Sequence, residues 1–254
     1  MTTKHFAKKK WGQNFLADTN LLKRIVRTID PQPTDNVLEI GPGEGALTEL
    51  LLPAVGNLAA IEIDPRLVEF LKNRDNLRDC HFIHGDVLEL ELSELPIPIP
   101  VWVMGNIPYN ITSPILFWLI EQRQYWTAAF LMVQREVAER LTGKVGTKAY
   151  GRLTVMIGAF LEVKYCFTIP PTVFQPRPQV DSAFIALRKL DQPLVPNDKF
   201  KQFEKIVGAA FSQRRKMLRN SLAGFQLSAP GLENIELTRR PETLTTEEFV
   251  SLIS

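Results

Sequence analysis

The feature that most constrains the fold of this chain is the glycine-rich stretch of residues 39–48, with the sequence EIGPGEGALT. It follows the apolar residues 36–38, which predict a short buried strand, and it leads into the leucines at 47 and 50–52, which predict a helix. Glycines at such a junction permit positive φ angles and let the backbone approach a ligand closely. The order of strand, glycine turn and helix predicts a nucleotide-like ligand, the alternative being a turn of a parallel sheet that binds nothing.

The acidic residues near this turn indicate which ligand it is. Gly41, Gly43 and Ala46 satisfy a loose dinucleotide fingerprint, and Glu62 lies about 20 residues further on, where an acid can bind ribose hydroxyls. However, Glu44 places a carboxylate at the start of the helix, where a pyrophosphate needs an uncompensated positive end. S-adenosylmethionine carries a sulfonium and an ammonium group and no phosphate. The carboxylate-rich loop therefore favours S-adenosylmethionine over NAD.

Composition excludes few function classes. The 254 residues are 45% hydrophobic, which suffices for a large core, and the net charge of +2 does not by itself indicate a nucleic-acid partner. The two cysteines and three histidines show no metal-ligand spacing, so we expect no metal site. The sequence contains no run of 18 apolar residues, so no transmembrane helix is expected, and the basic N-terminus is not followed by the apolar core of a signal peptide. These features favour a cytoplasmic protein, the alternative being a protein with an organellar address.

Strands and helices alternate along the first two thirds of the chain. The expected fold class is α/β, a Rossmann-like, mostly parallel sheet in a domain of residues 1–190. Its last two strands, joined without a helix, predict an antiparallel edge hairpin. Residues 191–198 predict a linker, and a small all-helical domain is expected over 191–254, with helices at 200–211, 217–222 and 246–253. The expected strands are 36–38, 58–63, 80–84, 101–104, 128–134, 160–169 and 180–187, and the expected helices of this part include one capped by Asp18, one opened by Pro65 and one capped by Ser113.

Two successive strands end on an acid, Glu62 and Asp86. In an open parallel sheet the ligand lies at the carboxyl ends of the strands, so both acids are expected to face the same crevice as Gly41. An Asx turn or a helix cap is the alternative role for Asp86.

The tetrad Asn106, Ile107, Pro108 and Tyr109 at the end of the fourth strand carries the most specific chemistry. The exocyclic amino group of a nucleobase is a poor nucleophile because its lone pair is delocalised into the ring. Two acceptors aimed at its hydrogens, the Asn106 amide oxygen and the Ile107 carbonyl oriented by Pro108, would direct that lone pair at a methyl donor.

Aromatic side chains would hold the base. Tyr109 is expected to stack on it, an interaction worth about 1–3 kcal/mol, and Phe174, set among prolines, is a candidate for the opposite face. The alternatives are a core aromatic for Tyr109 and a loop plug for Phe174. No general base is required, because the ammonium formed by transfer is acidic, so catalysis would rest on positioning and desolvation.

Taken together, these motifs resemble the ribosomal RNA adenine dimethyltransferase family, and the match covers almost the whole chain in order. Within this family the chain is most similar to the small-subunit enzyme, which dimethylates two adjacent adenosines in the 3′-terminal hairpin. The motifs that carry the resemblance are residues 13–16 (QNFL), 39–45 (EIGPGEG), Glu62, Gly85-Asp86, 106–109 (NIPY) and 174–182 (FQPRPQVDS). One departure is Ile107, where the family more often has leucine; because the backbone of this residue matters, we expect no loss of activity.

The resemblance implies S-adenosyl-L-methionine as donor and four methyl transfers per RNA. It implies that Asn14 and Leu16 border the methionine and adenosyl moiety and that Gly41 and Gly43 lie in the cofactor loop. It further implies that Glu62 binds the ribose hydroxyls, that Asp86 binds the amino group of the cofactor adenine, and that Asn106 lies between cofactor and target.

Basic residues at both ends are expected to grip the RNA backbone, although such runs are often only solvated surface. They are Lys8, Lys9, Lys10, Arg214, Arg215, Lys216 and Arg219. The expected partner is small-subunit ribosomal RNA in an assembling subunit, bound by a monomer. Three other functions stay open: a non-catalytic assembly or transcription factor, a DNA adenine methyltransferase, and the large-subunit branch of the family that confers macrolide resistance.

Overall fold

A computed structural model describes residues 13–253 of the chain. The expected RNA-binding residues Lys8, Lys9 and Lys10 lie outside this range. The chain divides into two compact units. The first holds the described residues up to Arg135 together with Cys166–Leu187, and the second holds Glu136–Tyr165 together with the described residues from Arg188 on. The boundary near residue 190 between a catalytic and an RNA-binding domain stays a prediction about function.

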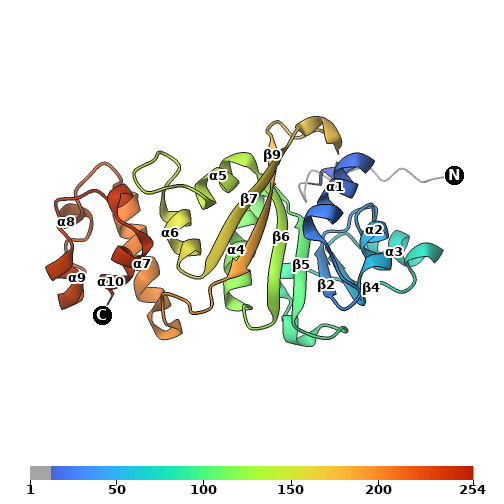
Figure 1. The fold of residues 1–254 in the computed structure, drawn as a ribbon, viewed down its shortest axis with the longest axis horizontal. Coiled ribbons are helices and arrows are strands. Elements are labelled where there is room, and N and C mark those ends of the chain that lie inside the picture. The colour runs from blue at the N-terminus through green and yellow to red at the C-terminus, as the bar shows by residue number, and fades with distance from the viewer. Residues whose placement is uncertain (1–12, 254) are drawn as a thin grey trace. The chain divides into compact units, whose positions relative to one another are not determined.

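The large sheet has seven strands in the order β4-β3-β2-β5-β6-β9-β7 (Figure 1). Its five successive strands from β4 to β6 pair in parallel, and β9 and β7 follow at the far edge, where the hairpin was expected. The mostly parallel α/β sheet predicted from the sequence is therefore confirmed. The bounds are β2 Asn36–Ile40, β3 Asn57–Glu62, β4 His81–His84, β5 Val101–Asn106, β6 Trp126–Gln134, β7 Leu161–Ile169 and β9 Ser182–Lys189.

A second, two-stranded sheet was not predicted. It pairs β1 (Phe15–Leu16) with β8 (Phe174–Gln175) in antiparallel register, Phe15 opposite Gln175 and Leu16 opposite Phe174. The backbone N–H of Ala17 extends the contact by donating to the carbonyl of Val173 at 3.1 Å. This small sheet ties the N-terminal segment to the proline-rich segment more than 150 residues away.

Most of the predicted helices form, and two of them begin at the caps that the sequence indicates. Asp18 caps α1, its side chain accepting a hydrogen bond from the Leu21 N–H at 2.7 Å, and Asp64 caps α3, which opens on Pro65. Ser113 is not a cap: α4 already begins at Thr112, after the tight turn η6 (Tyr109–Ile111). The bounds are α1 Thr19–Ile29, α2 Thr48–Leu51, α3 Pro65–Lys72, α4 Thr112–Glu121, α5 Arg135–Leu141, α6 Arg152–Gly158, α7 Phe200–Ser212, α8 Leu218–Ser221, α9 Ala229–Asn234 and α10 Thr246–Ser251.

Strand order creates the place for a ligand. From β2 the chain moves outward to β3 and β4, and it then returns to β5 on the other side of β2. Such a reversal leaves a crevice at the carboxyl ends of β2 and β5. Gly105 lets these two strands approach, because a Cβ there would lie 2.7 Å from the carbonyl oxygen of Ile40. The glycine loop after β2 and the tetrad at the end of β5 therefore meet at one edge.

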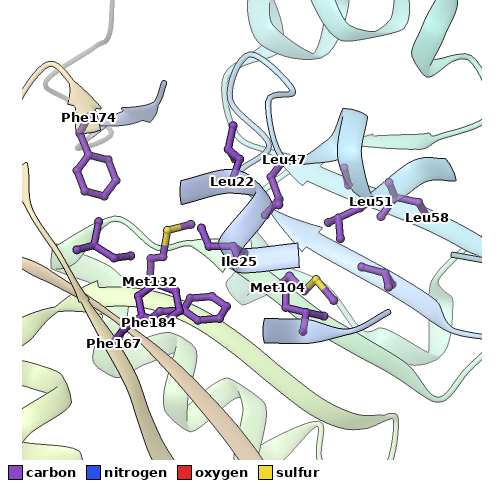
Figure 2. Close-up of a cluster of buried hydrophobic side chains, with 14 of the residues drawn as sticks. Leu22, Ile25, Leu47, Leu51, Leu58, Met104, Met132, Phe167, Phe174 and Phe184 are labelled. Carbon is purple, nitrogen blue, oxygen red and sulfur yellow. The ribbon is translucent and has the colours of Figure 1, made fainter. Parts of the chain in front are cut away.

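The core of the first unit is a cluster of buried side chains from α1, the central strands and β8 (Figure 2). Leu22 and Ile25 of α1 belong to this cluster, and Phe174 points from β8 toward the side of the cluster that contains Met132. Within the described part of the chain, no helix combines the length and apolarity that a membrane span requires.

Candidate active site

A cavity opens at the carboxyl ends of β2, β3 and β5, within the first unit. It brings together most of the residues that the sequence predicted for cofactor and base. Its lining consists of residues 13–16, Glu39–Glu44, Ala46–Leu47, Ile61–Ile63, Gly85–Val87, Asn106–Tyr109, Ile111 and Met132. The expectation that Glu62 and Asp86 face the same crevice as Gly41 is confirmed.

Glu62 binds the backbone of the glycine loop. Its carboxylate accepts a hydrogen bond from the Gly43 N–H at 3.3 Å and another from the Asp64 N–H at 3.0 Å. Burial raises the pKa of Glu62, and these N–H donors act against that rise. Gly43 has φ +59°, and a Cβ there would lie 2.9 Å from the Phe15 ring. The loop is therefore held between a carboxylate on one side and the aromatic ring on the other.

Glu39 is a cavity residue whose role sequence reasoning missed. It is 3% exposed in the middle of the sheet and accepts a hydrogen bond from the Thr48 hydroxyl at 2.6 Å. Burial raises the pKa of the Glu39 carboxyl to about 7; the Thr48 bond opposes this and the charge of Glu62 adds to it. A carboxylic acid inside an otherwise apolar strand, two residues before Gly41, was the signal available in the sequence.

The N-terminal residues 13–16 form one wall of the cavity. Asn14 and Leu16 lie in this wall as expected, together with Gln13 and Phe15. The backbone carbonyl of Asn14 accepts a hydrogen bond from Asn106 Nδ2 at 2.7 Å. The wall is thus fastened to the tetrad by a side-chain hydrogen bond.

This bond sets the orientation of the Asn106 amide. Because a carbonyl can only accept, the nitrogen of the amide must face Asn14 and its oxygen must point elsewhere. Among the residues that the structure describes, none donates a hydrogen bond to that oxygen. Ile107 follows, buried, with its N–H bonded to the Met132 carbonyl at 3.1 Å. The arrangement offers the Asn106 oxygen as an acceptor at the cavity wall.

Tyr109 lines the cavity and is fixed from behind. Its hydroxyl lies 2.7 Å from the hydroxyl of Ser182, the first residue of β9, which is 1% exposed. Burial raises the pKa of Tyr109, so the phenol stays neutral and can either donate or accept this bond. The structure does not bring Phe174 to the cavity: it is 3% exposed and packs in the hydrophobic cluster (Figure 2). Its stacking on a base stays a prediction that requires the proline-rich segment to move.

The chemistry of the cavity suits a cationic nucleoside. Glu39, Glu62 and Asp86 contribute carboxyl groups to the lining, and Asp86 also caps the short helix η4 (Val87–Glu89) by accepting from the Leu88 N–H at 3.0 Å. A Cβ on Gly41 would meet no atom within 4 Å, so the loop leaves room for a ligand against its backbone. These residues fit a sulfonium donor better than a pyrophosphate. No group of three or more metal-ligating side chains occurs in residues 13–253.

The basic residues predicted near the C-terminus lie in the second unit and differ in environment. Arg215, Lys216 and Arg219 are exposed, whereas Arg214 is half-buried and donates hydrogen bonds to the carbonyls of Lys148 and Thr147.

Comparison with known proteins agrees with this geometry. Residues 4–253 match the family model described as ribosomal RNA adenine dimethylase. The chain is 43% identical to the ribosomal RNA small subunit methyltransferase A of Janthinobacterium sp. (strain Marseille) over 98% of both chains, and 44% identical to that of Prosthecochloris aestuarii over 97% of this chain and 93% of the relative.

Two solved structures share the fold over most of its length. A dimethyladenosine transferase from Plasmodium falciparum superposes with a TM-score of 0.79 at 27% identity, covering 94% of this chain and 95% of that one. The 23S rRNA methyltransferase ErmE superposes with a TM-score of 0.73 at 30% identity, covering 94% of this chain and 98% of that one. The chain therefore belongs to the ribosomal RNA adenine dimethylase family of S-adenosylmethionine-dependent methyltransferases.

Proposed function

We propose that this enzyme dimethylates the exocyclic amino groups of two adjacent adenosines in the 3′-terminal hairpin of small-subunit ribosomal RNA. The observation that carries the chemistry is the Asn106 amide, whose nitrogen is held by the Asn14 carbonyl and whose oxygen remains as an acceptor. The small subunit as substrate is supported by the relatives that are named for it. The partner is ribosomal RNA within an assembling small subunit, bound by a cytoplasmic monomer.

The tetrad makes the target amino group nucleophilic. The Asn106 oxygen and the Ile107 carbonyl accept its two hydrogens, which favours a pyramidal nitrogen with its lone pair free for attack. Tyr109 stacks on the base, which must leave its helical stack to reach the cavity. The nitrogen then takes the methyl group as the sulfur–carbon bond breaks, and the resulting ammonium loses a proton to water or to the same acceptors. Repetition converts each adenosine to the dimethyl form.

The acidic residues of the cavity hold the methyl donor. Glu62 binds the ribose hydroxyls, Asp86 the adenine amino group, and Asn14, Leu16 and the loop with Gly41 and Gly43 enclose the remainder. When bound, S-adenosylmethionine supplies an electrophilic methyl group. The Glu62 carboxylate compensates part of its positive charge.

The experiment that tests this function is transfer of a labelled methyl group from S-adenosylmethionine to unmethylated small ribosomal subunits, followed by nucleoside analysis. Large subunits and DNA serve as parallel acceptors, and Asn106→Ala serves as the inactive variant. Label in dimethyladenosine of the small subunit alone is the expected result. Label in the large subunit would move the chain to the branch that contains ErmE, and label in DNA would refute the RNA assignment.

A role in subunit assembly follows from the same proposal. Asn106→Ala should abolish methylation and still co-sediment with small subunits, because RNA binding rests on other residues. Loss of both activities would refute a separate role in assembly, and cofactor binding without any methyl transfer by the wild type would instead support a non-catalytic assembly factor.

A further inference from the structure

Arg214 is bound differently from its basic neighbours in the second unit. Its Nη1 donates to the carbonyl of Lys148 at 2.9 Å and its Nη2 to the carbonyl of Thr147 at 3.0 Å. Its Nε lies 4.0 Å from a carboxylate oxygen of Glu242. A planar guanidinium is suited to such a two-pronged contact, which a lysine cannot reproduce. Arg214 is therefore a tie between its own segment and the loop of residues 143–149.

The loop of residues 143–149 is held from a second side as well. The N–H of Gly146 donates to the carbonyl of Glu242 at 2.8 Å, and the N–H and hydroxyl of Thr147 both bond the Lys144 carbonyl. The loop carbonyls thus face Arg214 and internal donors. Lys144 and Lys148 are exposed. The loop therefore presents two ammonium groups to solvent from a fixed backbone.

The segment that follows Arg214 is held in a similar way. The N–H of Leu218 donates to the Arg239 carbonyl and the N–H of Arg219 to the Leu237 carbonyl, each at 2.9 Å. Together with the loop lysines, this segment supplies five exposed cations that form no ion pair with any residue in the described range. They are Lys144, Lys148, Arg215, Lys216 and Arg219.

We propose that the loop of residues 143–149 and the segment Arg215–Arg219 form one surface that binds the phosphate backbone of RNA. In this surface Lys144 and Lys148 contact phosphates, and Arg214 is a positioning residue that holds the loop in place. Unpaired cations on an ordered backbone bind a polyanion at low conformational cost, and each contact releases a counterion. The proposal rests on the proposed RNA substrate and adds to it a segment outside the expected C-terminal domain.

The salt dependence of binding tests the two roles. Binding of unmethylated small ribosomal subunits is measured by co-sedimentation over a range of KCl concentrations at fixed Mg²⁺. Each phosphate contact contributes about 0.7–0.9 to the slope of log K against log salt. Lys144→Ala/Lys148→Ala should lower that slope by about 1.5. Arg214→Lys keeps the charge and loses the tie, so it should weaken binding nearly as much as the double variant and add little to it when the three changes are combined.

Controls separate this surface from bulk charge and from misfolding. Lys72→Ala/Lys201→Ala removes two exposed lysines elsewhere, on α3 and α7, and should leave the slope nearly unchanged. Amide exchange should rise in residues 143–149 of Arg214→Lys while the unfolding midpoint stays within a few degrees of the wild type.

Three results would overturn the inference: a slope unchanged by the loop lysines, an equal loss in the control pair, or wild-type binding by Arg214→Lys. Methyl transfer by the wild-type enzyme is measured in parallel. If it labels ribosomal adenosine while the loop variants bind normally, the inference fails and the proposed function stands. A different result is also possible: the wild type labels no RNA, and the loop lysines instead change the binding of an acidic protein. In that case RNA is not the polyanion that this surface binds.

Discussion

The hydroxyl pair of Tyr109 and Ser182 gives a prediction about how the target base is held. In Ser182→Ala the tyrosine loses a 2.7 Å hydrogen bond from its hydroxyl to a side chain that is 1% exposed. A neutral hydrogen bond contributes about 0.5–1.5 kcal/mol, and a buried hydroxyl left without a partner costs about 1–3 kcal/mol. If the bond fixes the ring for stacking, its loss should raise the activation free energy for kcat/KM with RNA by about 1–2 kcal/mol. The value of kcat/KM should then fall roughly 5- to 30-fold.

A double-mutant cycle isolates the bond. Tyr109→Phe keeps the ring and removes the hydroxyl, so it should lower kcat/KM for small subunits as much as Ser182→Ala does, and the double variant should equal either single one. Initial rates of labelled methyl transfer supply these values, and calorimetric binding of S-adenosylmethionine should be unchanged. Ser228→Ala, which removes another buried serine hydroxyl at the start of α9, is the matched control and should keep full activity. Additive losses in the double variant would refute the reasoning, because they would mean that the two hydroxyls act independently.

Three further predictions concern the cofactor side of the cavity. Gly43→Ala should raise the Kd of S-adenosylmethionine at least tenfold, because its Cβ meets the Phe15 ring at positive φ, whereas Gly224→Ala, with φ +90° and open space, should leave cofactor binding unchanged in calorimetry. Glu39 keeps its proton to about pH 7 in the folded protein, whereas the unfolded side chain loses it near pH 4.5. The free energy of unfolding should therefore fall by about 3 kcal/mol as the pH rises from 4.5 to 7. Urea titrations should show this fall in the wild type and not in Glu39→Gln. Asn106→Asp cannot donate to the N-terminal wall, so methyl transfer should fall at least 100-fold in single-turnover assays with a cofactor Kd changed less than fivefold, and a near-normal rate would contradict the assigned orientation.

Local chemistry explains which parts could be predicted from the sequence. The glycine loop, the acids at strand ends and the tetrad are each contiguous, so their place at the sheet edge followed from strand order alone. The α1 cap followed from Asp18 in the same way. The predicted cap at Ser113 was wrong because α4 begins one residue earlier, at Thr112, directly after a tight turn. Helix α9 was missed because it contains Pro230 and Gly231, which both lower helix propensity.

The remaining features depend on contacts between distant residues. The bond from Asn106 to Asn14 spans 92 positions, and the Tyr109 pair spans 73. No spacing rule connects them. Phe174 was expected in the base pocket because prolines flank it, whereas its pairing with the N-terminal strand turns the ring into the core. The tie made by Arg214 likewise depends on a loop 66 residues earlier, which charge counting could not distinguish from phosphate binding.

The small β1–β8 sheet has a consequence for turnover. A wall held by a two-residue ladder and a few single bonds should detach more easily than a strand of the large sheet, so local opening of residues 13–16 would give spent cofactor a way out. Because the same wall holds the Asn106 amide, each detachment would also release the acceptor of the target amino group. Cofactor exchange and loss of catalytic alignment would then be a single event, so an enzyme that must reload for every methyl group would rebuild its acceptor site each time.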